Sequence, residues 1–243
     1  MGGDARHLRR GARTALMLLV AEITDAANAE GLLATLRVPA REVLLVDSTG
    51  EDWPAPPGVR VHRRDPPMRV GWAGAWNIGG RITHSHLVVC HEATRFGSAG
   101  GRDLRALLDR RGDDAPGALL RTPGLVVLRH EVLRTAGLFD ENLWPDGGVM
   151  LDYARRAELL GLAWGGLPVE LAARGRFDAV LAHEPARRYY RAKWGGPPGE
   201  ERHTEPHRGQ PVGWWPSPRH VSPGGRDRRV LYQPANPADV GLV

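Results

Sequence analysis

The sequence predicts an α/β fold with a mostly parallel central sheet, because short apolar runs alternate with helical stretches through the first half of the chain. Strands are expected at 14–20, 42–46, 59–62 and 86–90, and helices at 24–36 and 71–83. Open sheets of this kind bind ligands at the carboxyl ends of their strands. Asp47 and the pair His91 and Glu92 directly follow strand ends, which makes that edge of the sheet the expected site.

The second half of the chain is less regular. Helices are expected at 102–110, 131–136, 151–160 and 185–194, with one or two strands within 119–128 and a last strand at 179–182. Between residues 195 and 228, 14 of 34 residues are Gly or Pro, which predicts an extended arm. The expected organisation is a frayed N-terminus at 1–12, one domain at 13–194 and a C-terminal arm at 195–243.

Composition excludes several classes of protein. The 243 residues include one cysteine, Cys90, which rules out an intrachain disulfide framework and is expected to be an inert residue at the end of a buried strand. No apolar run approaches the ~18 to 20 residues that a membrane span needs. The run at 15–21 is followed by acidic residues and no clear cleavage site, so we expect a buried first strand and a cytoplasmic protein.

The net charge of +5 does not by itself indicate nucleic-acid binding. Of the 33 basic residues only Lys193 is a lysine, and the arginines are spread along the chain. This skew, beside abundant Ala, Gly and Pro, indicates a coding bias, so no nucleic-acid partner is expected. An anionic ligand such as a nucleotide diphosphate fits a mildly basic protein.

Several stretches share their order and spacing with a known family. They are VDSTGED at 46–52, GWAGAWNIG at 71–79, TAGLFDENL at 135–143, DYARR at 152–156 and YRAKWGG at 190–196. Over roughly 15–205 the chain resembles the family 2 glycosyltransferases of the GT-A fold, a Rossmann-like nucleotide-diphospho-sugar transferase fold. The resemblance implies transfer of a sugar from a UDP-, GDP- or dTDP-sugar to an unidentified acceptor, in a family that uses Mn²⁺ or Mg²⁺.

The resemblance implies that Glu22, Asp47, Asn77, His91 and Glu92 contact the nucleotide sugar. Asp47 would accept a hydrogen bond from a uracil or thymine N–H, or alternatively cap the turn that follows it. Asn77 would lie near the ribose or the diphosphate, or alternatively bond a neighbouring loop. Glu22 follows the first strand, where the family's loop touches the base.

The family's metal-binding motif is degenerate in this chain. Its acidic triplet, whose last Asp holds the metal, is replaced by His91, Glu92 and Ala93. Because Ala93 has no ligand atom, no tightly bound Mg²⁺ or Mn²⁺ is expected. The alternative is a rebuilt site from His91, Glu92 and His183, a set of ligands that suits Mn²⁺ or Zn²⁺.

The catalytic motif is degenerate as well. Val149 and Met150 replace the acidic pair that includes the family's catalytic base, and Asp152 alone remains. Asp146 is a candidate base, with a plain turn residue as the alternative. Asp152 is a second catalytic candidate, and its alternative role is an ion pair with Arg155 or Arg156.

On the acceptor side, the resemblance implies a buried Phe139, with Asp140 or Glu141 facing the acceptor. Three interpretations of the chain stay open. It is a transferase with relocated catalytic groups, a metal-free transferase that neutralises the diphosphate with Arg69 or Arg95, or an inactive pseudoenzyme that binds nucleotides or a protein. The sequence does not decide the oligomeric state, and a homodimer is one option.

Overall fold

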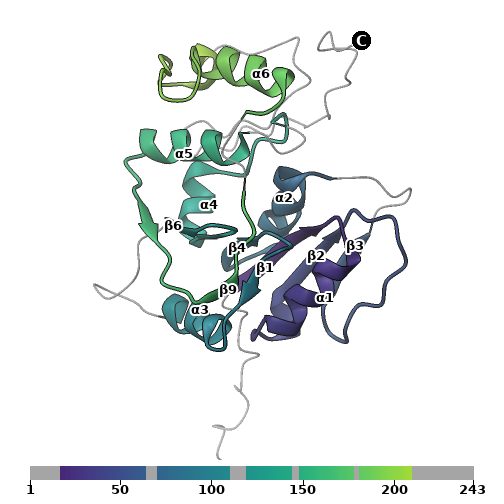
Figure 1. Ribbon diagram of the computed structural model, residues 1–243. Coiled ribbons are helices and arrows are strands. Elements are labelled where there is room, and N and C mark those ends of the chain that lie inside the picture. The colour runs from purple at the N-terminus through teal and green to yellow at the C-terminus, as the bar shows by residue number, and fades with distance from the viewer. Residues whose placement is uncertain (1–16, 64–69, 110–118, 144–147, 178–180, 210–243) are drawn as a thin grey trace, which may run out of the picture.

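The computed structural model describes residues 17–63, 70–109, 119–143, 148–177 and 181–209 (Figure 1). Seven of its strands form one sheet in the order β3-β2-β1-β4-β7-β6-β8. They are β1 (Met17–Ile23), β2 (Val43–Asp47), β3 (Arg60–Arg63), β4 (His86–Cys90), β6 (Leu119–Thr122), β7 (Leu125–Leu128) and β8 (Trp164–Gly166). A separate two-stranded ribbon consists of β5 (Arg95–Phe96) and β9 (Leu171–Ala173).

The central sheet is mostly parallel. The pairs β1–β2, β1–β4, β2–β3 and β6–β8 are parallel, whereas β7 runs antiparallel to both β4 and β6. This confirms the expected α/β fold class. The hairpin β6–β7 turns at Pro123 and Gly124, where Gly124 has a φ of 76°, a backbone region that favours glycine.

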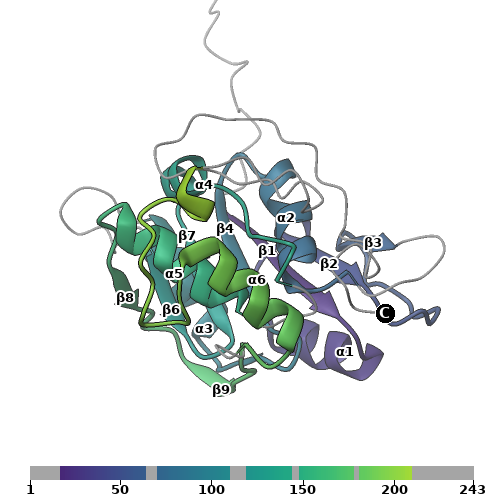
Figure 2. The ribbon, with the colours of Figure 1, turned by 90° about the horizontal axis from the view of Figure 1, so that it is seen from above.

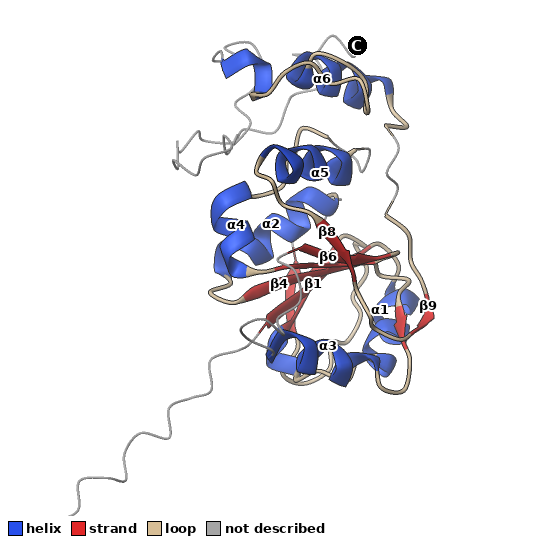
Figure 3. Cartoon of the chain, turned by 90° about the vertical axis from the view of Figure 1, so that its left-hand side faces the viewer, coloured by secondary structure: helices blue, strands red, loops and turns tan. Residues whose placement is uncertain are grey.

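Helices cover both faces of the sheet (Figures 1 and 3). One face packs against α1 (Ala26–Thr35) and α3 (Gly100–Asp109). On the other side, the sheet shares one hydrophobic core with α2 (Trp72–Ile82), α4 (His130–Ala136), α5 (Val149–Leu159) and α6 (Glu184–Trp194). Of these helices, α6 lies farthest from the sheet, beyond α5 (Figures 1 and 3). Along β1, Met17 and Leu19 belong to the first core, whereas Leu18 and Val20 belong to the second. Because both faces are covered, β1 is buried along its whole length.

Some details differ from the expected elements. The first strand extends to Ile23, because its last residues still pair with β2. Leu181 and Ala182 are not in a strand, and the rest of the strand expected at 179–182 lies outside the described residues. Neither β8 nor β9 is among the expected strands, since three-residue strands rich in Gly and Ala carry no apolar run.

The start of the C-terminal arm packs against α6, which Figure 2 shows lying in front of the sheet. The backbone N–H groups of Arg202 and His203 both donate to the Trp194 carbonyl at 3.0 Å. A short 3-10 turn follows at Pro206–Gly209. The N-terminus to residue 16 and the arm from residue 210 lie outside the described ranges. Within those ranges, no helix combines the length and the apolar character that crossing a bilayer requires.

Cys90 ends β4, where its side chain is buried. Burial raises the pKa of the Cys90 thiol to about 12. The thiolate is the reactive form of cysteine, so this thiol is protonated and unreactive at neutral pH. The structure agrees with the inert residue expected from the sequence.

The helix α2 lies directly on β1. A Cβ atom added to Gly79 would lie 2.3 Å from Val20 Cγ2, so the backbone of the helix comes closer to the sheet than any larger residue permits. This contact holds the C-terminal half of α2 against the middle of β1.

A buried ion pair ties α3 to the turn that precedes β2. The Glu42 carboxylate has no exposed surface, and Arg105 Nη1 lies 2.7 and 2.6 Å from its two oxygens. A carboxylate in such a position needs a cation, because an unpaired buried charge is costly.

We expect Arg105→Met to lower the free energy of unfolding by about 3 to 5 kcal/mol, because it leaves the Glu42 carboxylate buried without its cation. The matched control is Arg102→Met at an exposed position of the same helix, with a change within about 0.5 kcal/mol. Urea titrations followed by circular dichroism measure both. Equal effects of the two substitutions would show that the pair does not support the fold.

Candidate functional site

The carboxyl ends of β1, β2 and β4 lie at one edge of the sheet. Ile23 is in register with Asp47, and Val20 with Val89, so Glu22, Asp47 and His91 lie near the ends of three adjacent strands. Because β1 separates β2 from β4, Asp47 and His91 are two strand spacings apart, about 10 Å. One nucleotide is long enough to span that distance.

Glu22 joins three elements at this edge. Its Oε1 accepts hydrogen bonds from Ser48 Oγ at 2.8 Å, Gly71 N at 2.8 Å and Val70 N at 3.2 Å. Its Oε2 is buried and has no hydrogen-bond partner within the described part of the chain. Glu22 therefore fixes the start of α2 to the strand ends and keeps one carboxylate oxygen unpaired.

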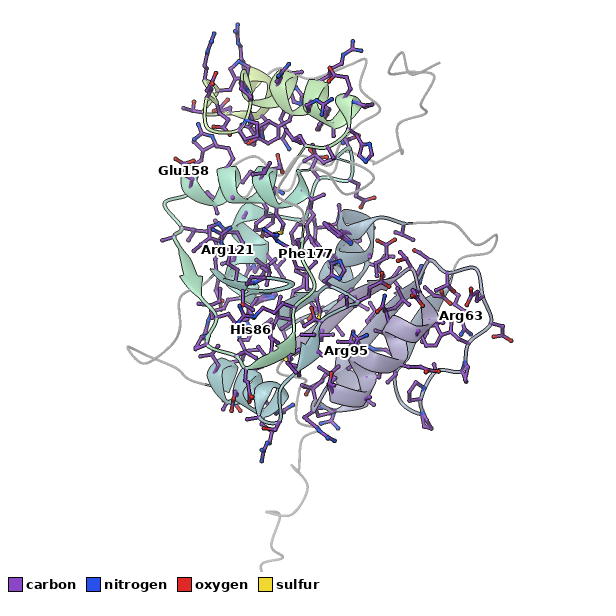
Figure 4. All side chains as sticks on the ribbon, viewed as in Figure 1. Arg63, His86, Arg95, Arg121, Glu158 and Phe177 are labelled. Atoms are coloured by element: carbon purple, nitrogen blue, oxygen red, sulfur yellow. The ribbon has the colours of Figure 1, made fainter. Side chains whose placement is uncertain are left out.

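Asp47 is bonded within its own turn and to β3. Its Oδ1 accepts from Thr49 N at 3.0 Å and Thr49 Oγ1 at 2.8 Å, and its Oδ2 accepts from Arg63 Nε at 3.0 Å (Arg63 is labelled in Figure 4). Burial raises the pKa of Asp47, but the bonds from Thr49 and Arg63 outweigh burial and lower that pKa below its usual value. The carboxylate thus caps the turn, as in the alternative interpretation.

Glu92 holds the loop between β1 and α1. Its two oxygens accept from Thr24 N at 2.6 Å, Thr24 Oγ1 at 2.5 Å and Asp25 N at 3.2 Å. His91 Nδ1 accepts from Ala93 N at 3.1 Å, so this ring nitrogen faces its own turn. Both residues of the pair that replaces the family's acidic triplet therefore make hydrogen bonds within the chain.

An aromatic surface borders His91. Trp72 and Phe177 lie edge-on to each other with ring centroids 5.2 Å apart, and both contact the His91 ring, at 5.6 and 5.8 Å. Trp72 stacks on the buried Trp76 at 6.0 Å. Trp72, His91 and Phe177 are half-buried, so they present ring surface at the edge of the sheet.

The residues at this edge do not fit a divalent metal ion. Among the described residues, no three His, Cys, Asp or Glu side chains come together as a metal site, so His91, Glu92 and His183 do not form the rebuilt site. His183 is exposed at the start of α6. Arg95 is not available as a substitute cation either, because it donates to the Glu92 and Thr94 carbonyls and to Asn28 Oδ1.

Asn77 fixes the loop that follows α4. Its Nδ2 donates to the Phe139 carbonyl at 2.8 Å and to Glu141 Oε1 at 2.7 Å, while its Oδ1 accepts from Phe139 N at 2.8 Å. Arg81 also pairs with Glu141, at 2.9 Å. Asn77 is buried and fully bonded, which corrects the expected nucleotide contact in favour of the loop-bonding alternative.

A buried network joins α5 and α6 to the same loop. Lys193 Nζ lies 2.6 Å from Asp140 Oδ2 and 2.6 Å from Asp152 Oδ1, and the Lys193 side chain is 1% exposed. Asp152 also accepts from Trp194 Nε1 at 2.9 Å and from Arg156 Nε at 3.0 Å. Both carboxylates are therefore neutralised inside the protein.

This network changes the expected role of two residues. Asp140 is 3% exposed and accepts a further bond from Tyr189 OH at 2.8 Å, so it is part of the core and does not face an acceptor. Asp152 has no exposed surface, which agrees with the structural alternative and its ion pair to Arg156. Phe139 is buried as expected. Asp146 lies outside the described residues.

Sequence reasoning missed several residues around the site. The spacing of Trp72 and Trp76, one helical turn apart, is a signal that identifies one side of the aromatic surface. Lys193 carries a weaker signal as the only lysine of the chain. Arg63 and Phe177 carry none, because tertiary packing alone brings them to the edge.

No protein-family model and no curated protein matches this chain. Among solved structures, it is similar to the mannosyltransferase PcManGT from Pyrobaculum calidifontis in complex with GDP-Man and Mn²⁺, at 16% identity and a TM-score of 0.48, over 63% of this chain and 55% of that one. It is similar to S. aureus TarS 1-349 at 13% identity and a TM-score of 0.45, over 64% and 59%.

TarS 1-349 in complex with UDP gives 13% identity and a TM-score of 0.46, over 65% of this chain and 60% of that chain. The chain thus spans between 55% and 60% of the length of these structures. The likeness concerns the fold alone.

We expect Asn77→Ala to destabilise the protein by about 2 to 4 kcal/mol, because it leaves the backbone N–H and carbonyl of Phe139 buried without partners. Ile82→Ala, at an exposed position of the same helix, is the control. Thermal unfolding and nucleotide titrations are run on both variants. Lost nucleotide binding at unchanged stability would restore Asn77 as a ligand contact.

His207 contacts the network from the C-terminal arm. Its ring lies 5.8 Å from that of Tyr189. Burial, followed by the positive charge of Lys193, lowers the pKa of His207 from 6.5 to about 4, while Asp140 opposes the shift. Between these two values the unfolded chain binds a proton that the folded chain does not, so stability falls as the pH falls through this range.

We therefore expect the free energy of unfolding to decrease between pH 6.5 and pH 4 more steeply in the wild type than in His207→Gln. Because the ring is partly exposed, the difference accumulates to less than about 3 kcal/mol. Urea titrations at each pH measure it, with the exposed His62→Gln as the control. Identical slopes in wild type and His207→Gln would contradict the protonation argument.

Proposed function

We propose that the chain is a glycosyltransferase-type protein that binds a nucleotide-diphosphate sugar at the carboxyl edge of β1, β2 and β4. It transfers the sugar to a hydroxyl group of an acceptor without a resident metal. The observation that carries the proposal is the meeting of three strand ends, which brings Glu22, Asp47 and His91 together beside the aromatic surface. Parallel α/β sheets bind their ligands at this edge.

In this proposal the described residues bind and orient the donor. Glu22 Oε2 accepts an N–H of the base, because a buried oxygen without a partner gains most from a new hydrogen bond. Asp47 shapes the adjoining turn through its bonds to Thr49. Trp72 and Phe177 offer ring surface to the base or the sugar.

The transfer step itself requires a base and a cation. The acceptor oxygen bonds to the anomeric carbon as the bond from that carbon to the diphosphate breaks, and the hydroxyl proton passes to the base. We assign Asp146 as the base and Arg69 as the cation for the leaving diphosphate. Arg69 precedes Val70, whose N–H bonds Glu22. Both assignments lie outside the described residues and stay predictions.

The second candidate function is a non-catalytic module that binds nucleotide sugars. One observation favours it: Asp47, Glu92, Asp140 and Asp152 already make bonds within the chain. Turnover separates the two candidates. A transferase releases nucleoside diphosphate from its donor and loses this release, but not donor binding, in Asp146→Asn. A module binds the donor and releases nothing.

We expect one of the UDP-, GDP- and dTDP-sugars to bind with the same affinity in EDTA and in excess Mn²⁺, because no metal ligand stands at Ala93. Isothermal titration calorimetry measures the two affinities. Glu22→Gln weakens binding by about tenfold, since the amide cannot replace a charged acceptor. Glu51→Gln, an exposed carboxylate of the neighbouring loop, has no effect.

Two results would contradict this proposal. A large gain in affinity with Mn²⁺ that is lost in His91→Ala would establish a metal site and overturn the metal-free assignment. No binding of any of the three donors would overturn donor binding and, with it, both candidate functions.

A further inference from the structure

A second group of polar side chains lies at the opposite edge of the sheet. β4 begins at His86, and the antiparallel β7 ends at Leu128, in register with Leu87. Arg129 and His130 follow directly, at the start of α4. His86 and His91 are therefore at opposite ends of β4.

Arg129 carries two shielded donors that have no acceptor. Its Nε and Nη2 are buried, and neither has a hydrogen-bond partner within the described ranges. A guanidinium group is always charged, and these two nitrogens each point an N–H bond in the same direction, in the plane of the group and along one of its edges. Buried donors without partners are rare in proteins. This pair matches the two oxygens of a carboxylate or phosphate group.

Two histidines border Arg129. His130 Nδ1 is also buried without a partner among the described residues, and the His130 backbone N–H donates to His86 Nδ1 at 3.2 Å. Because His86 Nδ1 accepts, the proton of its neutral ring is on Nε2. Burial lowers the pKa of His86, the charge of Arg129 lowers it further, and the exposed Glu131 opposes both. The positive charge of Arg129 thus disfavours protonation of the His86 ring.

We propose that this edge is an oxyanion-binding site, in which Arg129 Nε and Nη2 hold a carboxylate or phosphate group beside His86 and His130. The group enters between side chains, because both donors are shielded from solvent. The site lies at the far end of β4 from the proposed donor site and does not depend on the proposed function.

Binding of inorganic phosphate and of acetate tests the proposal, with ionic strength held constant by NaCl. Titrations followed by calorimetry and by the melting temperature use the whole chain. We expect saturable binding of at least one anion, weakened about tenfold or more in Arg129→Met. In chloride alone, Arg129→Met melts at a higher temperature than the wild type, because it removes two shielded donors that have no acceptor.

Arg134→Met is the matched control, since Arg134 is exposed on the same helix and carries the same charge. It should bind both anions as the wild type does. A response to phosphate alone identifies a phosphate group as the ligand, and a response to acetate alone identifies a carboxylate. We expect Arg129→Met to bind nucleotide sugars with wild-type affinity, because Arg129 lies far from the proposed donor site. A failure of the donor-binding proposal can therefore be distinguished from a failure of this one.

Either of two results would overturn the proposal. One is an equal response of Arg129→Met and Arg134→Met to both anions. The other is a lower melting temperature of Arg129→Met in chloride alone, because the guanidinium would then already have an acceptor within the chain.

Discussion

Lys193 places its ammonium group between two carboxylates that come from different parts of the chain. Asp140 lies in the loop after α4, Asp152 lies in α5, and Lys193 lies in the last turn of α6. Each of the three charges is buried and would be costly without the others. The loop that Asn77 bonds, the position of α5 and the docking of α6 with the first part of the arm all depend on this contact. In this contact, charged groups of the kind that a catalytic site uses for chemistry stabilise the fold instead.

The two edges of the sheet differ in how well their polar groups are paired. At the carboxyl edge, Asp47 and Glu92 have found partners in neighbouring turns, and one oxygen of Glu22 is unpaired. At the opposite edge the unpaired groups are two N–H donors of Arg129 and the ring nitrogen Nδ1 of His130. The first edge is therefore suited to a ligand that donates hydrogen bonds, and the second to a ligand that accepts them. The difference follows from local pairing, since the net charge of the chain does not distinguish the edges.

Local sequence signals predicted most of the helices and strands, but they did not predict which residues far apart in the sequence contact each other. The strand at His86–Cys90 has the expected bounds, and Asp25 caps α1 through a bond to Ala27 N, as its position before an apolar stretch indicates. The ion pair of Asp152 with Arg156 follows from helical spacing.

Other contacts depend on residues far apart in the sequence. The bond between Asn77 and Phe139 is one, and the contact of Glu92 with Thr24 is another. For a side chain such as Asn77, the sequence is compatible with two roles, because a ligand and a neighbouring loop can make the same hydrogen bonds with it. Burial decides between them, and burial is a property of the folded chain.

The only thiol of the chain makes β4 observable by chemistry. Cys90 immediately precedes His91 and is buried and protonated in the folded state, so an alkylating reagent reacts with it only after the strand has opened. The rate of alkylation in native conditions therefore reports how often the carboxyl end of β4 separates from its neighbours, without any introduced label. A ligand held at that edge slows the modification in proportion to its occupancy. Cys90, which has no role in the proposed chemistry, thus reports the opening of the part of the molecule where that chemistry is proposed.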